Sequence, residues 1–167
     1  FVGIAGTGMS AIAQYLRGCG KTVTGSDRLF AAGSKSQLQQ QFEDMGITCA
    51  LQDGSGIDSS IDLVVVSTAI EESNVEYQKA LSLNIPIAKR SAVLAAISDD
   101  VKTIAVGGTS GKSTTTAMVY HVLSQAELSP SLITGAGLTE LQEKGLPGNA
   151  IKGDGEWLVI EADESDG

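Results

Sequence analysis

Residues 103–116, with the sequence TIAVGGTSGKSTTT, constrain the fold of this chain more than any other stretch. The apolar residues 104–106 predict a strand, and Gly111-Lys112-Ser113 predicts the start of a helix that runs to about Gln125. A helix start attracts phosphate because its first N–H groups have no intrahelical acceptor and because the helix dipole is positive there. The stretch therefore predicts a phosphate-binding loop between a strand and a helix.

The residue types of this loop suit the phosphates of a nucleotide. Its glycines let the backbone curl around phosphate oxygens, Lys112 offers a positive charge to the β- and γ-phosphates, and the Ser113 hydroxyl is a ligand for Mg²⁺. The common pattern G-x-x-x-x-G-K-[ST] has glycine at position 106, where this chain has Val106, and the glycines here are Gly107 and Gly108. An ordinary glycine and serine turn stays an alternative.

A predicted strand followed by carboxylates closes the chain. The apolar residues after Glu156 predict the strand, and Glu161 is the first carboxylate past it. Folds that hydrolyse nucleotides hold Mg²⁺ between the loop hydroxyl and a carboxylate at the end of a neighbouring strand. We therefore expect Glu161 to lie near Ser113, although a charged cluster at a strand end can also be plain solvated surface.

Composition limits the classes of partner. The 167 residues fit one large domain or two small ones, and an apolar content of 42% with 20 glycines fits a compact α/β protein. The formal net charge of −9 opposes a nucleic-acid partner. No apolar run approaches the roughly 20 residues of a membrane span. The two cysteines, Cys19 and Cys49, lack metal-ligand spacing, so we expect a reduced, cytoplasmic protein.

A second glycine-rich turn lies near the start of the chain. Residues 1–5 predict a strand, and Gly6, Gly8 and Ala11 match the pattern G-x-G-x-x-[GA] at the start of a helix that runs to about Arg17. A strand over residues 22–25 then delivers Asp27 to the place where a carboxylate accepts ribose hydroxyls. The pattern is that of a dinucleotide site, and a tight turn without a ligand is the alternative.

A β-branched run over residues 62–67 predicts a strand that is buried on both faces of a parallel sheet. Ser67, Thr68 and Ala69 follow at its carboxyl end. Ligands of open α/β sheets bind outside the carboxyl ends of strands, so we expect these three residues beside the loop of residues 6–10 and Asp27. A plain capping role for the hydroxyls of this segment stays open.

The remaining patterns complete a predicted α/β architecture. They predict helices over residues 37–45, 74–83 and 91–97, strands over 47–51, 85–88 and 131–134, and a long surface loop over 135–155. We predict a Rossmann-like doubly wound parallel sheet domain over residues 1–98, and the first part of a P-loop α/β ATPase domain over 99–167. The boundary is placed at the polar residues 98–100.

The helix over residues 111–125 carries an apolar stripe formed by Met118, Val119, Val122 and Leu123. His121, the only histidine of the chain, lies among them. No serine or cysteine nucleophile motif accompanies it, so we expect His121 to be packed or partly exposed and not catalytic.

Several separated stretches resemble one family, the ATP-dependent muramyl ligases that build the peptide of bacterial cell-wall precursors. Residues 1–10, FVGIAGTGMS, are similar to its F-[VI]-G-I-G-G-x-G-M-S loop, residues 25–27 to its G-S-D, and residues 108–115 to its G-T-H-G-K-[ST]-T-T loop. Residues 149–153 and 161–166 resemble its N-A-x-x-G and E-A-D-E-S-D strings. The short spacing of the phosphate loop is the family's own. Two departures are Ala5 for a family glycine and Ser110 for the usual histidine.

The resemblance implies a ligase that uses ATP and Mg²⁺. The branch that it resembles most joins L-alanine to UDP-N-acetylmuramate: the γ-phosphoryl group moves onto the muramyl carboxylate, and the amine then displaces phosphate from the acyl phosphate. The family enzymes have a third domain for the incoming amino acid beyond the E-A-D-E-S-D strand, so the resemblance implies that this chain alone is an inactive fragment.

The family's site residues map onto this chain by motif. The implied ATP-binding residues are Gly108, Thr109, Ser110, Gly111, Lys112, Ser113 and Thr114. The implied metal ligands are Ser113, Thr114 and Glu161, and the implied catalytic residues are Lys112 and Glu161. The implied UDP-sugar-binding residues are Gly6, Thr7, Gly8, Met9, Ser10, Asp27, Ser67, Thr68 and Ala69.

Three other functions compete with this interpretation. A related recycling ligase attaches a whole tripeptide to UDP-N-acetylmuramate, but it usually has tyrosine where Ser165 stands. An NAD-dependent oxidoreductase would explain the first glycine loop and leave the Lys112 loop unexplained. A non-catalytic nucleotide-binding regulator with the ligase fold is the third, and the Ser110 departure leaves this alternative open.

Overall fold

The computed structural model describes residues 1–30, 33 and 35–162. Its elements alternate along the chain as expected for an α/β protein. The helices are α1 (Thr7–Gly18), α2 (Gln37–Asp44), α3 (Val75–Ser82), α4 (Arg90–Asp100), α5 (Lys112–Gln125) and α6 (Thr139–Gln142). The strands are β1 (Thr24–Asp27), β2 (Thr48–Leu51), β3 (Val64–Val66), β4 (Ile87–Lys89), β5 (Lys102–Val106), β6 (Ser131–Ile133), β7 (Ala150–Ile151) and β8 (Trp157–Glu161).

The first unit is a parallel sheet built around the start of the chain. β1 pairs with β2 and β3 pairs with β4, both in parallel, and Val2 bridges Ser26 of β1 to Val66 of β3. In chain order the five segments therefore lie 3-2-1-4-5, which is the order of a Rossmann-like sheet. The predicted strand over residues 1–5 is wrong beyond Val2. Gly3 has a φ of +81°, a left-handed conformation that turns the chain into the glycine loop.

The second unit is a sheet with the order β5-β8-β6-β7. β5, β8 and β6 are parallel, and β7 pairs with β6 in the antiparallel direction. The predicted surface loop over residues 135–155 is wrong, because this segment contains α6 and β7 and buries Leu141, Asn149 and Ala150. The segment is rich in glycine, which is typical of loops, so the sequence pattern did not indicate these few buried positions.

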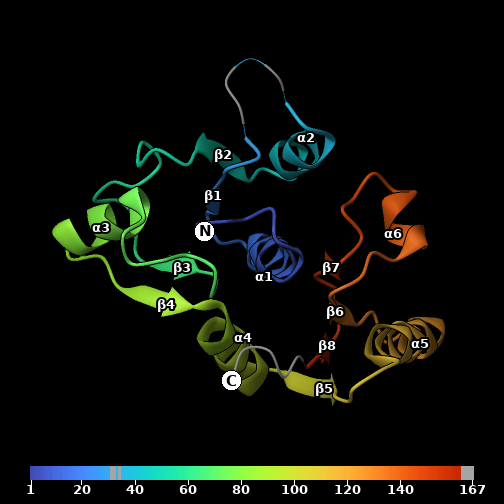
Figure 1. Ribbon diagram of the computed structural model, residues 1–167. Coiled ribbons are helices and arrows are strands. Elements are labelled where there is room, and N and C mark those ends of the chain that lie inside the picture. The colour runs from blue at the N-terminus through green and yellow to red at the C-terminus, as the bar shows by residue number, and fades with distance from the viewer. Residues whose placement is uncertain (31–32, 34, 163–167) are drawn as a thin grey trace.

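Helix α1 lies between the two sheets (Figure 1). Its residues 9–15 are all buried, as expected for a helix that is covered on opposite sides. Met9 and Ile12 share one apolar cluster with Val65 of β3, Ile133 of β6 and Leu158 of β8. The two units therefore have a common core, and each supplies part of the surface that buries α1.

Two predicted details of the second half are corrected. The polar residues 98–100 do not break the chain, since α4 continues to Asp100 and β5 begins at Lys102. The domain boundary near residue 98 stays a prediction. The predicted apolar stripe on α5 is only half covered, because Met118 is 64% exposed and Val122 is 65% exposed. The buried α5 residues are instead Thr116 and Tyr120.

The other predicted helices and strands are present, with ends shifted by a few residues. His121 is exposed on α5, and its Nδ1 lies 3.9 Å from Glu140 Oε2 of α6.

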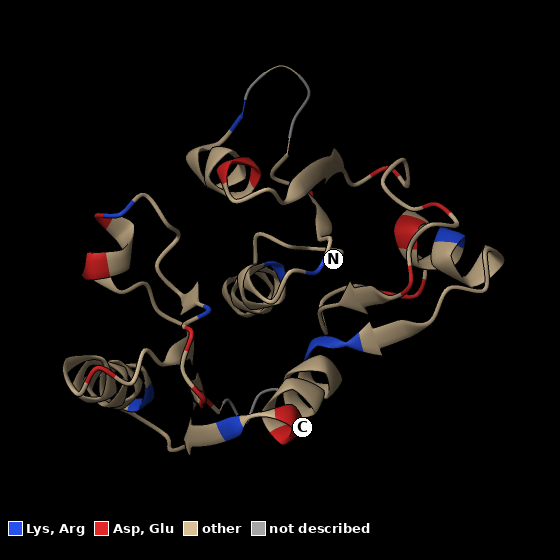
Figure 2. Ribbon diagram, turned by 180° about the vertical axis from the view of Figure 1, so that it is seen from behind, with Lys and Arg blue, Asp and Glu red and all other residues tan. Residues whose placement is uncertain are grey.

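Within the described residues, no helix is long and apolar enough to cross a membrane. Lys and Arg are scattered over both units (Figure 2). The absence of a nucleic-acid partner stays a prediction.

A buried carboxylate lies inside the first unit. Glu76 stands in the first turn of α3, has no exposed surface, and accepts a hydrogen bond from the Ser26 hydroxyl of β1. Burial raises the pKa of Glu76, and the opposing effect of the Ser26 hydrogen bond does not cancel this shift. The protonated form of Glu76 is therefore favoured by folding.

We expect Glu76→Gln to gain stability over the unchanged chain as the pH rises. A raised folded pKa gives a stabilising contribution that is complete below the unfolded pKa and is lost as the pH rises through the folded pKa. An uncharged glutamine side chain at this position does not titrate and lacks this loss. Urea unfolding at a series of pH values from acidic to mildly alkaline measures the difference.

The matched control is Glu72→Gln, which changes an exposed carboxylate in the turn before α3. Its free energy of unfolding should follow that of the unchanged chain at each pH. Parallel curves for Glu76→Gln and the unchanged chain would contradict this account of the buried carboxylate.

Candidate active site

The loop between β5 and α5 turns on two glycines with positive φ. Gly111 has a φ of +77° and Gly108 a φ of +138°, both in the range that glycine adopts without strain. No side chain in the described part of the protein caps the start of α5, and the first turn carries no acidic residue. The N–H groups at this helix start are therefore available to an anion. Residues 108–111 are exposed, Ser110 among them.

The carboxylate of Glu161 lies beside this loop, as predicted. β5 and β8 are parallel neighbours in which Val106 is paired with Glu161, so the loop and the carboxylate begin at the same edge of the sheet. The Ser113 hydroxyl lies 3.0 Å from each of the two Glu161 oxygens. Glu161 Oε2 also accepts from the Thr134 hydroxyl and from the Gly135 N–H, each at 2.9 Å.

These contacts keep Glu161 ionised. Partial burial raises the pKa of Glu161, but the hydrogen bonds from Gly135, Thr134 and Ser113 and the nearby Lys112 charge outweigh burial, and the pKa lies below its ordinary value. The ionised carboxylate of Glu161 and the hydroxyl of Ser113 are both hard oxygen ligands, so together they suit a hard cation.

The donor set fits Mg²⁺ better than a cation that needs an all-protein cage. Mg²⁺ in proteins is held by one or two carboxylates, with water and substrate phosphates completing the coordination. Ser113 and Glu161 supply such a partial set, and the described residues contain no group of three or more His, Cys, Asp or Glu side chains that could hold a metal. Ser113 contacts Glu161, whereas Thr114 is exposed. A metal role for Thr114 stays a prediction.

The glycine loop of the first unit is shaped by Asp27. This residue ends β1 and is 9% exposed. Its Oδ2 accepts from the Ala5 N–H at 2.9 Å, and its Oδ1 accepts from the Leu29 N–H at 3.0 Å. Asp27 therefore fixes the backbone that enters the loop. The predicted contact of Asp27 with a ribose stays a prediction.

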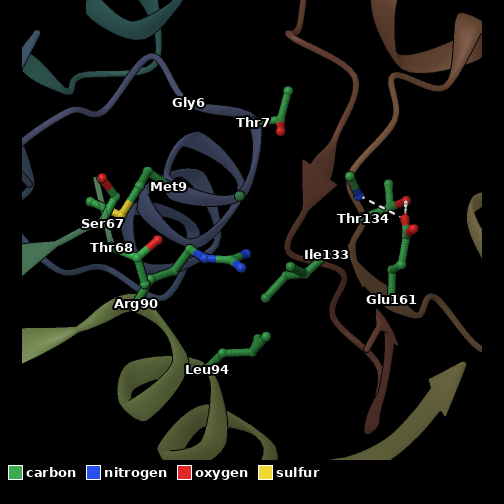
Figure 3. Close-up of a pocket in the computed structure, with 12 residues that line it drawn as sticks. Gly6, Thr7, Met9, Ser67, Thr68, Arg90, Leu94, Ile133, Thr134 and Glu161 are labelled. Atoms are coloured by element: carbon green, nitrogen blue, oxygen red, sulfur yellow. Dashed lines mark hydrogen bonds between the residues drawn. The ribbon is translucent and has the colours of Figure 1, made fainter. Parts of the chain in front are cut away.

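A cleft of about 290 Å³ separates the first glycine loop from Glu161 (Figure 3). One wall comes from the first unit and the other from the second. The lining residues are Gly6, Thr7, Gly8, Met9, Ser67, Thr68, Arg90, Leu94, Ile133, Thr134, Gly135 and Glu161. The predicted residues Ser10, Asp27 and Ala69 lie outside this lining, and Ser10 is buried with its hydroxyl 3.0 Å from the Thr7 carbonyl oxygen.

Arg90 is a cleft residue that the sequence analysis missed. It opens α4, and its side chain extends into the cleft between α1 and Ile133 (Figure 3). A Cβ added at Gly8 would come within 2.1 Å of Arg90 Nη1, so a side chain at this position would displace the guanidinium from its place beside the loop. The signal was present in the sequence. Arg90 follows β4 directly, and the carboxyl ends of strands are where ligands of such sheets bind.

The chain matches the family described as "Mur ligase family, catalytic domain" over residues 1–102. This match covers more than half of the chain, which therefore belongs to the Mur ligase family. The resemblance inferred from the glycine loops is confirmed. The residues 163–166 of the E-A-D-E-S-D string lie outside the described residues.

Individual relatives match the whole length of this chain. The chain is 40% identical over 167 residues to the UDP-N-acetylmuramate–L-alanine ligase of Mesorhizobium japonicum, matching all of this chain and 34% of that protein. It is 41% identical over 175 residues to the protein of the same name from Dictyoglomus turgidum, again matching 34% of that protein. The chain thus spans about a third of the length of these relatives.

Two solved structures have the same fold. The UDP-N-acetylmuramate–alanine ligase of Thermotoga maritima matches with a TM-score of 0.82 and 32% identity, over 99% of this chain and 36% of that one. The UDP-N-acetylmuramate:L-alanyl-gamma-D-glutamyl-meso-diaminopimelate ligase from Neisseria meningitides matches with a TM-score of 0.81 and 25% identity, over 99% of this chain and 52% of that one. The predicted α/β fold class is confirmed by both.

Proposed function

We propose that this chain is the amino-terminal third of an ATP-dependent ligase that joins L-alanine to UDP-N-acetylmuramate. The observation that carries the proposal is the hydrogen-bonded pair of Ser113 and Glu161, with Glu161 on one wall of a cleft whose other wall is the first glycine loop. A ligase of this class must bring a nucleoside triphosphate and the carboxylate that accepts its γ-phosphoryl group to the same site. The relatives named as L-alanine ligases support the same substrate pair.

In this proposal the second unit binds MgATP. The backbone of residues 108–114 surrounds the phosphates, with Lys112 next to the β- and γ-phosphates. Ser113 and Glu161 would hold Mg²⁺, and Thr114 would be a further ligand. The metal ion would offset negative charge on the phosphates. Lys112 adds a fixed positive charge at the same place, and this charge stabilises the phosphoryl group most while it is being transferred.

The first unit binds the UDP part of UDP-N-acetylmuramate in this proposal. The diphosphate lies at the loop of residues 6–10 and the start of α1, where N–H groups and the helix dipole favour an anion. Arg90 adds a guanidinium next to Gly8, and two parallel N–H groups of a guanidinium match phosphate oxygens. Asp27 and residues 67–69 lie toward the uridine or the sugar.

The reaction joins the two sites. The muramyl carboxylate accepts the γ-phosphoryl group of ATP and becomes an acyl phosphate, and the amine of L-alanine attacks its carbonyl carbon while phosphate leaves. The residues of this chain bind and orient both partners across the cleft. Holding two reactants in one geometry supplies a large part of the rate of such a reaction.

Two alternatives differ in the acceptor or the cofactor. The Neisseria structure carries a name for a peptide-adding ligase, so a peptide in place of L-alanine is the nearest competitor. Ser165, which favours L-alanine in the family pattern, lies outside the described residues. An NAD-dependent oxidoreductase would leave the Ser113–Glu161 pair without a role. We expect a cytoplasmic protein, in line with its nucleotide substrates.

Binding of UDP-N-acetylmuramate by this chain is the first test. A ligand at 100 times its dissociation constant adds about 2.7 kcal/mol to the folded state, which raises the melting temperature by roughly 5–10 °C for a chain of this size. We expect this shift with UDP-N-acetylmuramate in a thermal melt and none with NAD. A shift with NAD alone would contradict the proposal.

We expect Arg90→Ala to weaken binding of UDP-N-acetylmuramate by about 10- to 100-fold, the range of a charge-assisted hydrogen bond to a phosphate. Titration calorimetry with this nucleotide sugar measures the change. The control is Lys89→Ala, which removes the preceding cationic side chain, exposed at the end of β4 and outside the cleft. Equal affinities in the two variants would remove Arg90 from the binding site.

A further inference from the structure

Asn149 is a buried residue of the second unit whose side chain reaches into the first. It directly precedes β7 and is 5% exposed. Its Nδ2 donates to the carbonyl oxygen of Thr7 at 2.7 Å and to the Ser10 hydroxyl at 2.7 Å. Its Oδ1 accepts from Gln14 Nε2 at 2.8 Å. All three partners belong to the glycine loop and helix α1, 135 to 142 positions away in the sequence.

The backbone of Asn149 is tied to the opposite wall of the cleft. Its carbonyl oxygen accepts from the Thr134 N–H at 2.9 Å, because β6 and β7 are antiparallel neighbours. The Thr134 hydroxyl donates to Glu161 Oε2 at 2.9 Å, and Glu161 in turn accepts from Ser113. One continuous series of hydrogen bonds therefore connects Thr7 in the first glycine loop with Ser113 in the second.

The chemistry of the amide explains why an apolar side chain would not serve here. A buried amide is costly unless its donors and acceptor are paired, and both donors and the acceptor of Asn149 are paired. A shift of α1 against the segment that enters β7 would break these three hydrogen bonds. Apolar packing between the same elements tolerates small shifts, since it has no direction.

We propose that Asn149 is a positioning residue that sets the first glycine loop at a fixed distance from Glu161. The proposal rests on the ligase function proposed above, in which a carboxylate held by the first unit must meet a phosphoryl group held by the second. Asn149 is absent from the lining of the cleft, so it acts through Thr7 and Thr134. Its removal should disturb the geometry between two bound substrates more than the binding of either one.

The first variant is Asn149→Asp in the full-length protein. The side chain keeps its shape, but the two donors to Thr7 and Ser10 become an oxygen that cannot donate. We expect kcat for phosphate release to fall on the order of 10²-fold, the effect of a misplacement of about 1 Å between reacting groups. Calorimetry should give dissociation constants for UDP-N-acetylmuramate and for MgATP that stay close to those of the unchanged protein.

The second variant, Gln14→Met, disturbs the same network without burying a charge. Gln14 Oε1 has no hydrogen-bond partner among the described residues, so a methionine of similar length removes an unpaired buried oxygen. It also removes Gln14 Nε2, which donates to Asn149 Oδ1 at 2.8 Å and to the Ser10 carbonyl oxygen at 3.0 Å. We expect kcat to fall about fivefold, the factor that the one hydrogen bond to Asn149 represents, again with unchanged dissociation constants.

Ser131→Ala is the matched control. Ser131 is 2% exposed, lies on β6, and accepts a hydrogen bond from the Gly153 N–H at 3.1 Å. The variant removes a buried hydrogen bond of the second unit without touching the series from Thr7 to Ser113. Its kcat should equal that of the unchanged protein, whatever its melting temperature.

Each outcome decides the matter. A lower kcat with unchanged dissociation constants in the Asn149 and Gln14 variants, but not in Ser131→Ala, supports the positioning role. An unchanged kcat, or a loss confined to one dissociation constant, overturns it. If Asn149→Asp does not fold, Gln14→Met decides alone. Absence of ligation by the unchanged full-length protein would instead overturn the proposed function, and the inference with it.

Discussion

Lys112→Ala should lower kcat of the full-length protein by about 10³-fold, the loss seen when a group that stabilises charge in a transition state is removed. Lys112 opens α5 next to the Ser113–Glu161 pair and contributes to the low pKa of Glu161. In the proposed reaction, the positive charge of Lys112 is needed most during transfer of the phosphoryl group. MgATP binding should weaken by about 10- to 100-fold, whereas binding of UDP-N-acetylmuramate should be unchanged, because the first glycine loop lies in the other unit and Lys112 is absent from the lining of the cleft.

The control for this variant is Lys102→Ala. Lys102 starts the same strand that leads into the loop, is exposed, and pairs with Glu156. Exposed pairs of this kind contribute little to stability. In steady-state phosphate release and in calorimetry, Lys102→Ala should therefore have the kcat and the dissociation constants of the unchanged protein. Loss of UDP-N-acetylmuramate binding by Lys112→Ala would contradict the separation of the two sites.

Glu161→Gln should lower kcat by about 10²- to 10³-fold, because a metal-held charge in such a site is worth several kcal/mol. The substitution keeps the shape of the side chain but removes the charge that faces Ser113. A weaker metal site should also raise the Mg²⁺ concentration that gives half-maximal activity. A Mg²⁺ titration of phosphate release measures both effects in one experiment.

Glu156→Gln is the matched control, since Glu156 immediately precedes the same strand at its other end and is exposed. Its Mg²⁺ titration should coincide with that of the unchanged protein. If Glu161→Gln kept the wild-type Mg²⁺ dependence, Glu161 would be a structural acceptor for Thr134 and Gly135 and not a metal ligand.

The parts of the site that the sequence predicts are local or follow from strand order. The loop before α5 was predicted because an apolar run, glycines and a lysine lie within a few residues. Its contact with Glu161 was predicted because the loop and the carboxylate each follow a strand, and the ends of parallel neighbours meet at one edge. The Rossmann-like fold class followed from the same alternation of strands and helices.

The parts that the sequence did not predict depend on long-range packing. Asn149 lies in a glycine-rich segment, and nothing nearby indicates that it pairs with Gln14, Ser10 and Thr7. The exposure of Met118 was missed because spacing along a helix shows which side chains share a face but not what covers that face.

Whether these 167 residues alone can catalyse ligation can be tested. The two walls described here bind the nucleotide sugar and ATP in our proposal, and the relatives are about three times longer. Catalysis of this kind requires the carboxylate, the γ-phosphate and the amine in one geometry, and effective molarities of about 10⁵ M or more are lost when one partner is not held. We therefore expect binding by this chain without ligation.

The most direct test of the central claim is a phosphate-release assay with MgATP, UDP-N-acetylmuramate and L-alanine. It is run on this chain and on the full-length protein, with each substrate omitted in turn. The account predicts release by the full-length protein only when all three substrates are present, together with a product that is heavier by one alanine residue, and no release by this chain alone. Release by this chain, or a full-length protein that accepts a tripeptide and not L-alanine, would contradict it.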